Sequence, residues 1–418
     1  MDALTTPSNW QRVRLGDMTT SFTKQTGFDY SASIKPTLIK EQLPNYIPFI
    51  QNKDFLGHYI NYKTDYFIPN EIAIRFPQIL LNEKCLLISI SGAIGNVAVF
   101  NHSQDAFIGG AIAVLKFKEK KSLDFVMHFL MSVNGQKLLL NSVKSSSHKN
   151  LTIADLRDLL IPLPPLNEQI AIANILSDVD HYLYTLDALI LKKEGVKKAL
   201  SFELLSQRKR LKGFNQAWQR VRLGDIGITI SGLAGKTKQD FINGNAKYIT
   251  FLNVLNNVII DTSILENVKI YPNEKQNSFK KYDLFFNTSS ETPKEVGMCA
   301  VLLDDIDQVF LNSFCFGFRI FDKAVDSLFL SYLINSEIGR KAFENLAQGS
   351  TRYNLSKSGF NNICLILPPL NEQIAIANIL SGLDHEIISL KNKKRQFENI
   401  KKALNHDLMS AKIRVLKK

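Results

Sequence analysis

Two stretches of the chain carry apolar residues at alternating spacings of four and three, which is typical of a helix that packs along one stripe. The first stripe contains Ile172, Leu176, Val179, Leu183, Leu186 and Ile190, and the second contains Ile376, Leu380, Leu383, Ile387, Leu390 and Phe397. Each stripe follows a Pro-Pro pair, after which Asn167 and Asn371 are the predicted N-caps. We therefore predict two helices that begin at these asparagines and pack against each other as an antiparallel coiled coil.

Lysines interrupt both stripes, at Lys193 and Lys197 in the first and at Lys394 and Lys401 in the second. The middle of the predicted coiled coil is therefore less tightly specified than its first turns. An alternative is that each stripe belongs to an ordinary amphipathic helix packed on its own domain. Two matched stripes favour the coiled coil, because each predicted helix is about 65 Å long and a compact domain needs less.

Two sequence motifs occur twice. WQRVRLGD occupies Trp10–Asp17 and Trp218–Asp225, and LPPLNEQIAIANILS occupies Leu163–Ser177 and Leu367–Ser381. The chain is therefore a pseudo-twofold internal repeat of two variable regions and two shared helices. The predicted segments are a first domain at 1–162, a first spacer helix at 163–212, a second domain at 213–366 and a second spacer helix at 367–418.

The two variable regions show short, mixed periodicities that predict an α+β fold for each. The predicted strands are 46–50, 86–90, 97–100, 111–117, 248–252, 258–260 and 314–321, and the predicted helices are 125–131 and 328–338. We expect two similar globular α/β domains, separated by the two long helices. Shared strands with different loops are what two binding sites for different ligands would require.

Composition narrows the class of partner. The chain of 418 residues has 45% hydrophobic residues and a net charge of +12, so it can bury cores and favours a polyanionic partner. No apolar run is long enough to span a membrane and the first residues lack a signal-peptide pattern, so we expect a cytoplasmic protein without membrane contact. The four cysteines form no CxxC pair, which indicates reduced thiols and no zinc site.

Polar loops supply the candidate contacts to a polyanion, because hydroxyl, amide and cationic side chains bind phosphates and base edges. Two turns at 89–96 and 287–297 hold matching positions, and so do two basic segments that precede the proline pairs. The candidates are Ser89, Ser91, Lys144, Ser146, His148 and Lys149 in the first domain, and Asn287, Ser289, Ser350, Thr351, Arg352 and Tyr353 in the second. The alternative is that these are solvated loops without a ligand.

The segment GLAGKTK at 232–238 contains the end of a phosphate-binding loop. The complete motif needs a glycine at position 230, where the chain has Ile230, so the nucleotide-binding interpretation is weak. Because the first domain has an unrelated sequence here, the segment suits specificity better, and Lys236, Thr237 and Lys238 are further candidates for DNA contact.

Motifs for chemistry are missing from the sequence. The chain has neither the glycine-rich loop nor the catalytic tetrapeptide of a DNA methyltransferase, and its seven histidines show no HExxH or HxxxH spacing. We therefore expect no catalytic residue, no bound metal and no cofactor.

The doubled proline-led helix starts, the doubled WQRVRLGD and the GSTRYNL segment at 349–355 resemble the specificity subunit of type I restriction-modification enzymes. The resemblance covers essentially the whole chain. It implies two target-recognition domains that each read one half of a split, asymmetric sequence in double-stranded DNA. It further implies that the helices set the gap between the halves. The first-domain segment SSSHKNL lacks the Gly, Thr and Arg of its counterpart, so DNA contact is carried over less securely to Lys144–Lys149.

The resemblance also implies partner subunits. Two copies of an adenine methyltransferase subunit would dock on the helices, and a restriction subunit would join them. The helix residues with this implied role, or a role in the coiled coil, are Asn167, Glu168, Gln169, Ile172 and Leu176, with Asn371, Glu372, Gln373, Ile376 and Leu380. Two other hypotheses stay open: an autonomous DNA-modifying enzyme, and a structural coiled-coil protein that binds only proteins.

Overall fold

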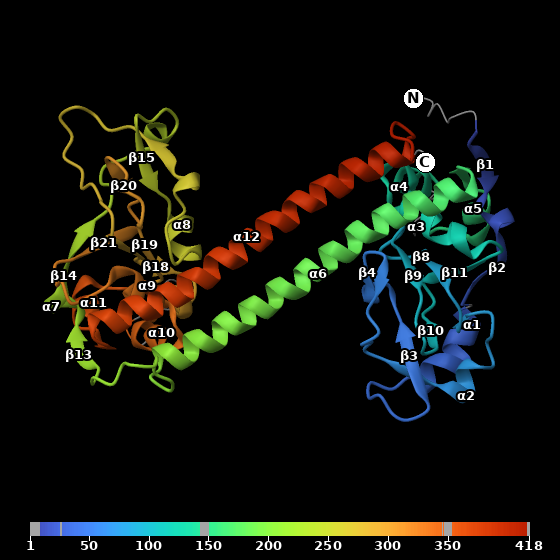
Figure 1. The fold of residues 1–418 in the computed structure, drawn as a ribbon, viewed down its shortest axis with the longest axis horizontal. Coiled ribbons are helices and arrows are strands. Elements are labelled where there is room, and N and C mark those ends of the chain that lie inside the picture. Colours follow the sequence, from blue (N-terminus) through green and yellow to red (C-terminus); the bar gives the residue numbers. More distant parts are fainter. Residues whose placement is uncertain (1–8, 26, 143–149, 345, 347–352, 416–418) are drawn as a thin grey trace. The chain divides into compact units, whose positions relative to one another are not determined.

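The computed structural model describes residues 9–25, 27–142, 150–344, 346 and 353–415. The chain forms two compact units, one of residues 1–187 with 393–418 and the other of residues 188–392 (Figure 1). Each unit therefore contains one mixed helix-and-sheet domain together with a part of both long helices. The predicted boundaries between domains and spacer helices follow the sequence repeat, whereas the compact units divide both helices.

The first unit is built on two four-stranded sheets. One has the order β2 (Thr19–Lys24), β11 (Ile112–Phe117), β8 (Cys85–Ser89) and β9 (Val97–Phe100), with antiparallel pairing throughout. The other has the order β6 (Phe67–Pro69), β3 (Tyr46–Ile50), β10 (Ala106–Ile108) and β7 (Leu80–Leu81), in which β3 and β10 are parallel. The shorter elements are β4 (Phe55–Leu56), β5 (Tyr59–Ile60), α1 (Gly27–Asp29), α2 (Asn70–Ala73), α3 (Leu123–Met131), α4 (Val133–Asn141) and α5 (Ile153–Arg157).

The second unit repeats this plan. Its larger sheet has the order β14 (Gly227–Ser231), β21 (Cys315–Ile320), β17 (Leu284–Asn287) and β19 (Cys299–Val301). Its smaller sheet has the order β16 (Glu266–Val268), β15 (Ala246–Ile249) and β20 (Val309–Leu311), again with one parallel pair, β15 and β20. The remaining elements are β18 (Ser289–Ser290), β22 (Tyr353–Asn354), α7 (Leu223–Ile226), α8 (Phe251–Asn256), α9 (Ser327–Asn335), α10 (Glu337–Glu344) and α11 (Lys357–Asn361).

The two repeated motifs meet in each unit. β1 (Gln11–Arg14), from the first WQRVRLGD, pairs with β12 (Leu160–Leu163), which leads into the first long helix. β13 (Gln219–Arg222) pairs with β23 (Cys364–Leu367) in the same register before the second long helix. The repeated motifs are therefore the closure of each domain, and each long helix starts from that closing strand.

The long helices are α6 (Leu166–Leu205) and α12 (Leu370–Met409). They begin one residue before the predicted N-caps, so that prediction was wrong. The carbonyl of Pro165 accepts the amides of Glu168 and Gln169, and the carbonyl of Pro369 does the same in α12. Asn167 and Asn371 consequently lie inside the first turn.

The first turns of each helix pack into the core of a domain. Ile172 and Leu176 are fully buried with Leu408 and Met409 in the larger core of the first unit. Ile376 and Leu380 are buried with Leu204 and Leu205 in the second unit, in the same way. The helix stripes therefore serve both predicted roles, because their outer ends are domain core and their middle faces the other helix.

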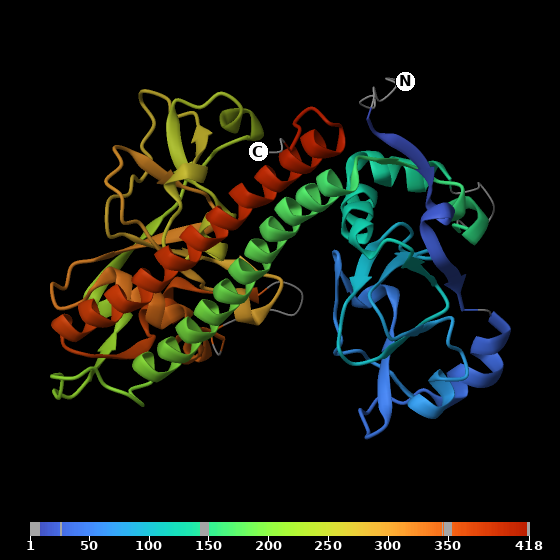
Figure 2. The same ribbon diagram turned by 45° about the vertical axis from the view of Figure 1, so that its right-hand side comes forward.

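The segments of α6 and α12 in the first unit run antiparallel (Figures 1 and 2). Ion pairs join α6 to α12 and to the residues that follow α12. Arg414 binds Glu168 at 2.7 Å, Lys401 binds Asp180, and Lys394 binds Asp187 at 2.6 Å. Asp180 is 4% exposed and also faces His58 at 3.4 Å and His128 at 4.0 Å. Burial, followed by the charges of His58 and Lys401, lowers the pKa of His128 to about 3, so this imidazole is neutral at physiological pH.

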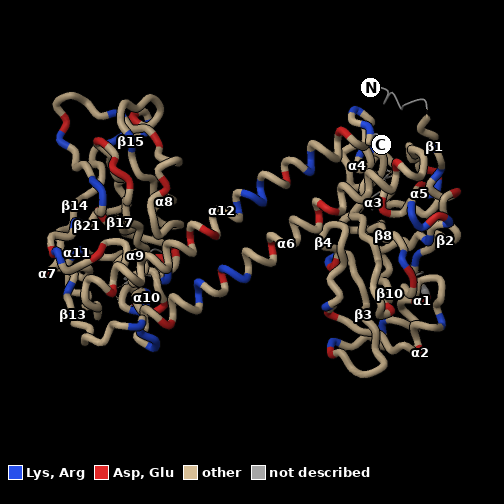
Figure 3. The backbone as a smooth tube through the Cα atoms, viewed as in Figure 1, with Lys and Arg blue, Asp and Glu red and all other residues tan. Residues whose placement is uncertain are grey.

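Equivalent pairs join the helix segments in the second unit. Arg210 binds Glu372 at 2.6 Å, and Lys197 binds Asp384 at 2.5 Å, in place of Arg414–Glu168 and Lys401–Asp180. The hydroxyl of Tyr332 donates to Asp384 at 2.7 Å. The lysines that interrupt the apolar stripes are thus ion-paired across the helices, and the two charge signs alternate along α6 and α12 (Figure 3).

Most predicted elements of the domains are confirmed, with three differences. The predicted strand 248–252 ends at Ile249, because the side chain of Thr250 accepts the amide of Asn253 and begins α8. The predicted helix 328–338 divides after Asn335, where the hydroxyl of Ser336 accepts the amide of Gly339 and begins a new helix. The stretch 258–260 makes only an isolated bridge from Ile259 to Val301. Within the described part of the chain, no helix is long and apolar enough to cross a membrane.

Candidate nucleic-acid interface

The polar turn of the first domain lies beside the chain that precedes α5. Ser89 ends β8 and is fully buried, where its hydroxyl donates to the carbonyl of Ala93 and accepts the amide of Asn96 at 2.9 Å. Ser91 forms an antiparallel bridge with Asn150. The turn therefore meets Asn150, which lies far along the sequence, with Ser89 holding the turn from inside and Ser91 at the junction.

The second domain has the same arrangement with different residues. Asn287 ends β17 and is fully buried, where its amide donates to the carbonyls of Ser289 and Glu295 and accepts the amide of Met298. Ser289 and Ser290 form β18, which pairs with Tyr353 and Asn354 of β22. Asn287 thus holds its turn as Ser89 does, and Ser289 and Tyr353 lie where the two candidate segments join.

In each domain one helix, α4 or α10, donates a hydrogen bond to a glycine carbonyl of the polar turn. Gln136 of α4 donates to the carbonyl of Gly95 at 2.9 Å, and Arg340 of α10 donates to the carbonyl of Gly297 at 2.9 Å. Both glycines have positive φ, 87° and 70°, which favours glycine. Arg340 also donates to the carbonyl of Val296, and its burial lowers the pKa of the guanidinium. The position of each turn is therefore fixed from the core side.

Removing this support should loosen the second turn. Arg340→Met keeps the apolar volume but leaves the carbonyls of Gly297 and Val296 without their donor, so we expect the free energy of unfolding to fall by about 2–3 kcal/mol. Arg340→Gln should lose clearly less, because Gln136 performs the same contact at Gly95. Urea unfolding of the three chains measures this difference, and equal stability of the Met variant and the parent would contradict it.

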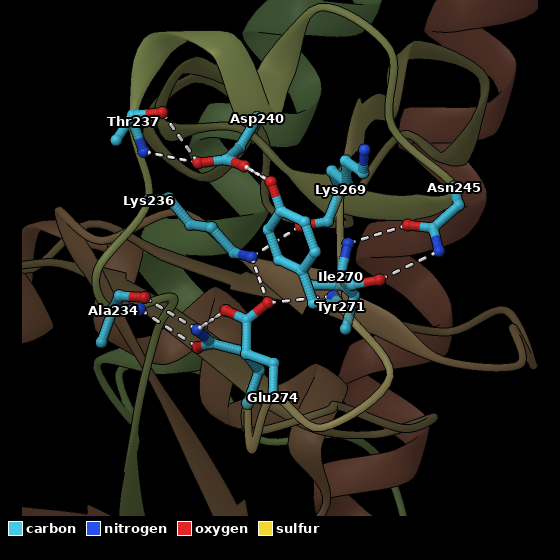
Figure 4. Close-up of polar contacts among 10 residues, drawn as sticks. Ala234, Lys236, Thr237, Asp240, Asn245, Lys269, Ile270, Tyr271 and Glu274 are labelled. Atoms are coloured by element: carbon cyan, nitrogen blue, oxygen red, sulfur yellow. Dashed lines mark hydrogen bonds and ion pairs between the residues drawn. The ribbon is translucent and has the colours of Figure 1, made fainter.

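Lys236 is paired inside the protein. Its ammonium lies 2.5 Å from Glu274 and 2.6 Å from the carbonyl of Lys269, and its side chain is only 5% exposed (Figure 4). Lys236 and Lys269 each lie 5.2 Å from the ring of Tyr271. The hydrogen bond from Lys236 holds the pKa of Glu274 below its usual range. Lys236 therefore joins two loops of the second domain and does not point to solvent.

Thr237, which follows Lys236 in the GLAGKTK segment, is also bonded inside the second domain. Asp240 accepts both the amide and the hydroxyl of Thr237, which begins the short 3-10 helix Lys238–Phe241, and these bonds lower the pKa of Asp240 (Figure 4). The amide and the hydroxyl of Thr237 are therefore already bonded within the domain. Lys238 is exposed and stays a candidate for DNA contact.

The helix candidates divide between buried and accessible positions. Glu372 and Gln373 are at most 1% exposed, and Gln169 is 5% exposed, because each bonds within its own unit. The helices also expose apolar side chains that were not among the predicted site residues, and their signal in the sequence is an apolar residue off the buried stripe. They include Ile175 and Leu191 in α6 and Ile379 and Ile388 in α12.

The basic segments Lys144, Ser146, His148, Lys149, Ser350, Thr351 and Arg352 lie outside the described residues. Among the residues that the structure describes, no group of three or more His, Cys, Asp or Glu side chains could hold a metal ion. All four cysteines are free, and burial raises the pKa of Cys85 and Cys315 to about 12.

Comparison with known proteins gives consistent matches. A family model described as the type I restriction modification DNA specificity domain matches residues 7–193 and again residues 215–399. The MjaVIII type I restriction enzyme specificity subunit of Methanocaldococcus jannaschii is 26% identical, over 99% of this chain and 95% of that protein. The EcoBI specificity subunit of Escherichia coli is 28% identical over 103 residues, 24% of this chain and 22% of that protein.

Solved structures share the fold. A type I restriction-modification S subunit from M. genitalium superposes with a TM-score of 0.62 at 17% identity, over 96% of both chains. A structure described with the assembly and conformational transition of the type I restriction-modification system gives a TM-score of 0.51 at 15% identity, over 96% of this chain and 98% of that one.

Proposed function

This chain belongs to the family of type I restriction-modification DNA specificity domains, and from that membership we propose that its two domains each read one half of a split DNA sequence. It acts as the non-catalytic specificity subunit, and the sequence that it selects is methylated or cleaved by partner subunits. Since the substrate is chromosomal DNA, we place the chain in the cytoplasm. The predicted division at 162, 212 and 366 describes the readers and the helices in this scheme.

One observation carries this proposal. The two domains share the same fold, but the polar side chains that hold the corresponding turn differ between them. Ser89 and Asn287 hold equivalent turns, and Gln136 and Arg340 support them, so the backbone plan is kept while the side chains differ. The loop around Lys236 has no counterpart of related sequence in the first domain. Two readers of different half-sites need this combination of a constant frame and divergent surface chemistry.

We propose two copies of a modification (methyltransferase) subunit as direct partners, with a restriction (endonuclease) subunit joining that complex. The repeat gives each unit an equivalent helical surface, which supports one modification subunit per unit. Exposed apolar residues such as Ile175 and its counterpart Ile379 are suited to such a contact, because the buried members of the same helices are already packed.

Methylome sequencing tests the proposal in cells that express this chain with its modification subunit. We expect one bipartite methylated motif. Replacing residues 213–366 by the corresponding domain of another specificity subunit should change one half of the motif and leave the other half and the gap unchanged. The unchanged half is then the one read by residues 1–162.

Two results would favour the other hypotheses. Methylation or cleavage by the purified chain without partner subunits would indicate an autonomous enzyme. A complex without affinity for DNA would indicate a purely structural protein, whereas a reader should bind DNA with an affinity that falls steeply as salt rises.

A further inference from the structure

One buried side chain of the first domain is left without partners. Gln25 follows β2 and is 3% exposed, and neither its amide oxygen nor its amide nitrogen finds a hydrogen-bond partner among the described residues. Burying an unbonded amide costs free energy, and native structures satisfy most such groups. An exception of this kind calls for a role outside the folding of the free chain.

Gln25 lies against a pocket. The pocket has a volume of about 490 Å³ and is lined by residues 51–53, Tyr66 and residues 109–112. A Cβ at Gly110 would lie 3.5 Å from the amide oxygen of Gln25, so the amide is next to the glycine wall. The side chain of Lys53 at the pocket is 51% exposed, which shows that the pocket reaches solvent.

The pocket is continuous with the candidate turn. Asn52 donates to the carbonyl of Ser91 at 2.7 Å, while its own side-chain oxygen is buried without a partner among the described residues. Asn52 thus lines the pocket with an unbonded amide oxygen, and the unbonded amide of Gln25 lies buried behind Gly110 of the pocket wall. A ligand that suits these groups must offer both hydrogen-bond donors and acceptors along one edge.

The second domain has different residues at the positions that correspond to Gln25 and Gly109. The strand register makes Gly232 the counterpart of Gln25 and Asn312 the counterpart of Gly109. The Asn312 amide is bonded at both ends, since it donates to the carbonyl of Ile249 at 3.2 Å and accepts the amide of Phe314 at 2.9 Å. A Cβ at Gly232 would lie 2.1 Å from the carbonyl of Asn312, so no larger residue fits there. The second domain therefore has no amide at the position of Gln25, and its neighbouring amide, Asn312, is bonded within the domain.

We propose that Gln25 reads a base in the half-site of the first domain, and that the pocket beside Gly110 admits the edge of that base. The chemistry favours the major-groove edge of adenine, whose N6 donates and whose N7 accepts, because a glutamine amide can bind both atoms at once. Since neither end of the amide is bonded in the free protein, turning it toward DNA breaks no hydrogen bond. This inference rests on the proposed function.

Gln25→Leu in the complete chain, expressed with the modification subunit, tests the assignment by methylome sequencing and thermal unfolding. We expect the motif to relax from adenine to any base at one position of the half assigned to residues 1–162, with the second half and the gap unchanged. The Tm of the purified variant should equal or exceed that of the parent, because an unbonded buried amide is removed. Gln25→Glu should shift the preference at that position toward cytosine, whose N4 amino group donates to a carboxylate.

Asn312→Leu is the matched control. It removes an amide of the same kind that is bonded at both ends, so it should lower the Tm and leave the first half of the motif unchanged. An unchanged motif for both Gln25 variants, or a Tm for Gln25→Leu as low as that of the control, would overturn the assignment of Gln25. A parent complex without any bipartite motif would instead overturn the proposed function itself.

Discussion

Lys401→Met should be among the most destabilising single substitutions on the helices, with a loss of about 3 kcal/mol in the free energy of unfolding. The substitution leaves the Asp180 carboxylate, 4% exposed, without its cation. In the parent chain, burial and the charge of Lys401 lower the pKa of the nearby His58, so Lys401 is the cation that balances this carboxylate. An uncompensated buried charge costs more than the pair itself contributes.

Lys197→Met at the equivalent position provides the control. Asp384 is 21% exposed and keeps the hydroxyl of Tyr332 as a donor, so we expect a loss of about 1 kcal/mol or less. Denaturant unfolding with hydrogen exchange in each unit assigns the losses. Adding Asp180→Leu to Lys401→Met should restore most of the stability, because no charge then remains buried. Equal losses for the two lysine variants would contradict this explanation.

Shortening both long helices by seven residues should shorten the gap between the two half-sites by about three base pairs, because seven helical residues span about 10 Å and one base pair about 3.4 Å. The ion pairs indicate which segments to remove so that the two helices keep their register. Asp187 pairs with Lys394 and Lys197 pairs with Asp384. Deleting 188–194 together with 387–393, which lie opposite each other, therefore retains both pairs and the register between them.

Methylome sequencing of cells that express the shortened chain measures the result. The bases of both half-sites should stay the same, since neither domain is altered. Deleting only 188–194 is the matched control, and it should abolish methylation, because the remaining ion pairs lose their register. A shortened chain that still methylates the original motif with the original gap would show that helix length does not set the spacing.

The family and the doubled plan were predictable from the sequence, and both are confirmed by the match of one specificity-domain model to each half of the chain. The two long helices were predictable as well, because apolar spacing and a proline-led start are local features of sequence. The ends of elements differed from the prediction where a single side chain decided them. Thr250 begins a helix inside a predicted strand, for example, because its hydroxyl accepts the amide of Asn253.

The candidate interface was predictable only in outline. The sequence placed polar turns and late segments at matching positions, but their meeting at Ser91 and Asn150, and at Ser289 and Asn354, depends on the folding of strands far apart in the chain. Lys236 was likewise a candidate for DNA contact from the sequence, whereas the structure pairs it inside the protein. Its partner Glu274 lies 38 residues away and leaves its side chain almost fully buried.

The sequence by itself therefore determined the repeat, the helices, the fold class and the family. Each of these depends on the spacing of nearby residues or on a motif that occurs twice. Tertiary structure alone decided which polar groups are already satisfied. Ser89, Asn287 and Lys236 use their hydrogen bonds inside the protein, whereas Gln25 is left unbonded beside a pocket. The physical reason is that a polar side chain is available to a ligand only when distant parts of the chain have not already bonded it.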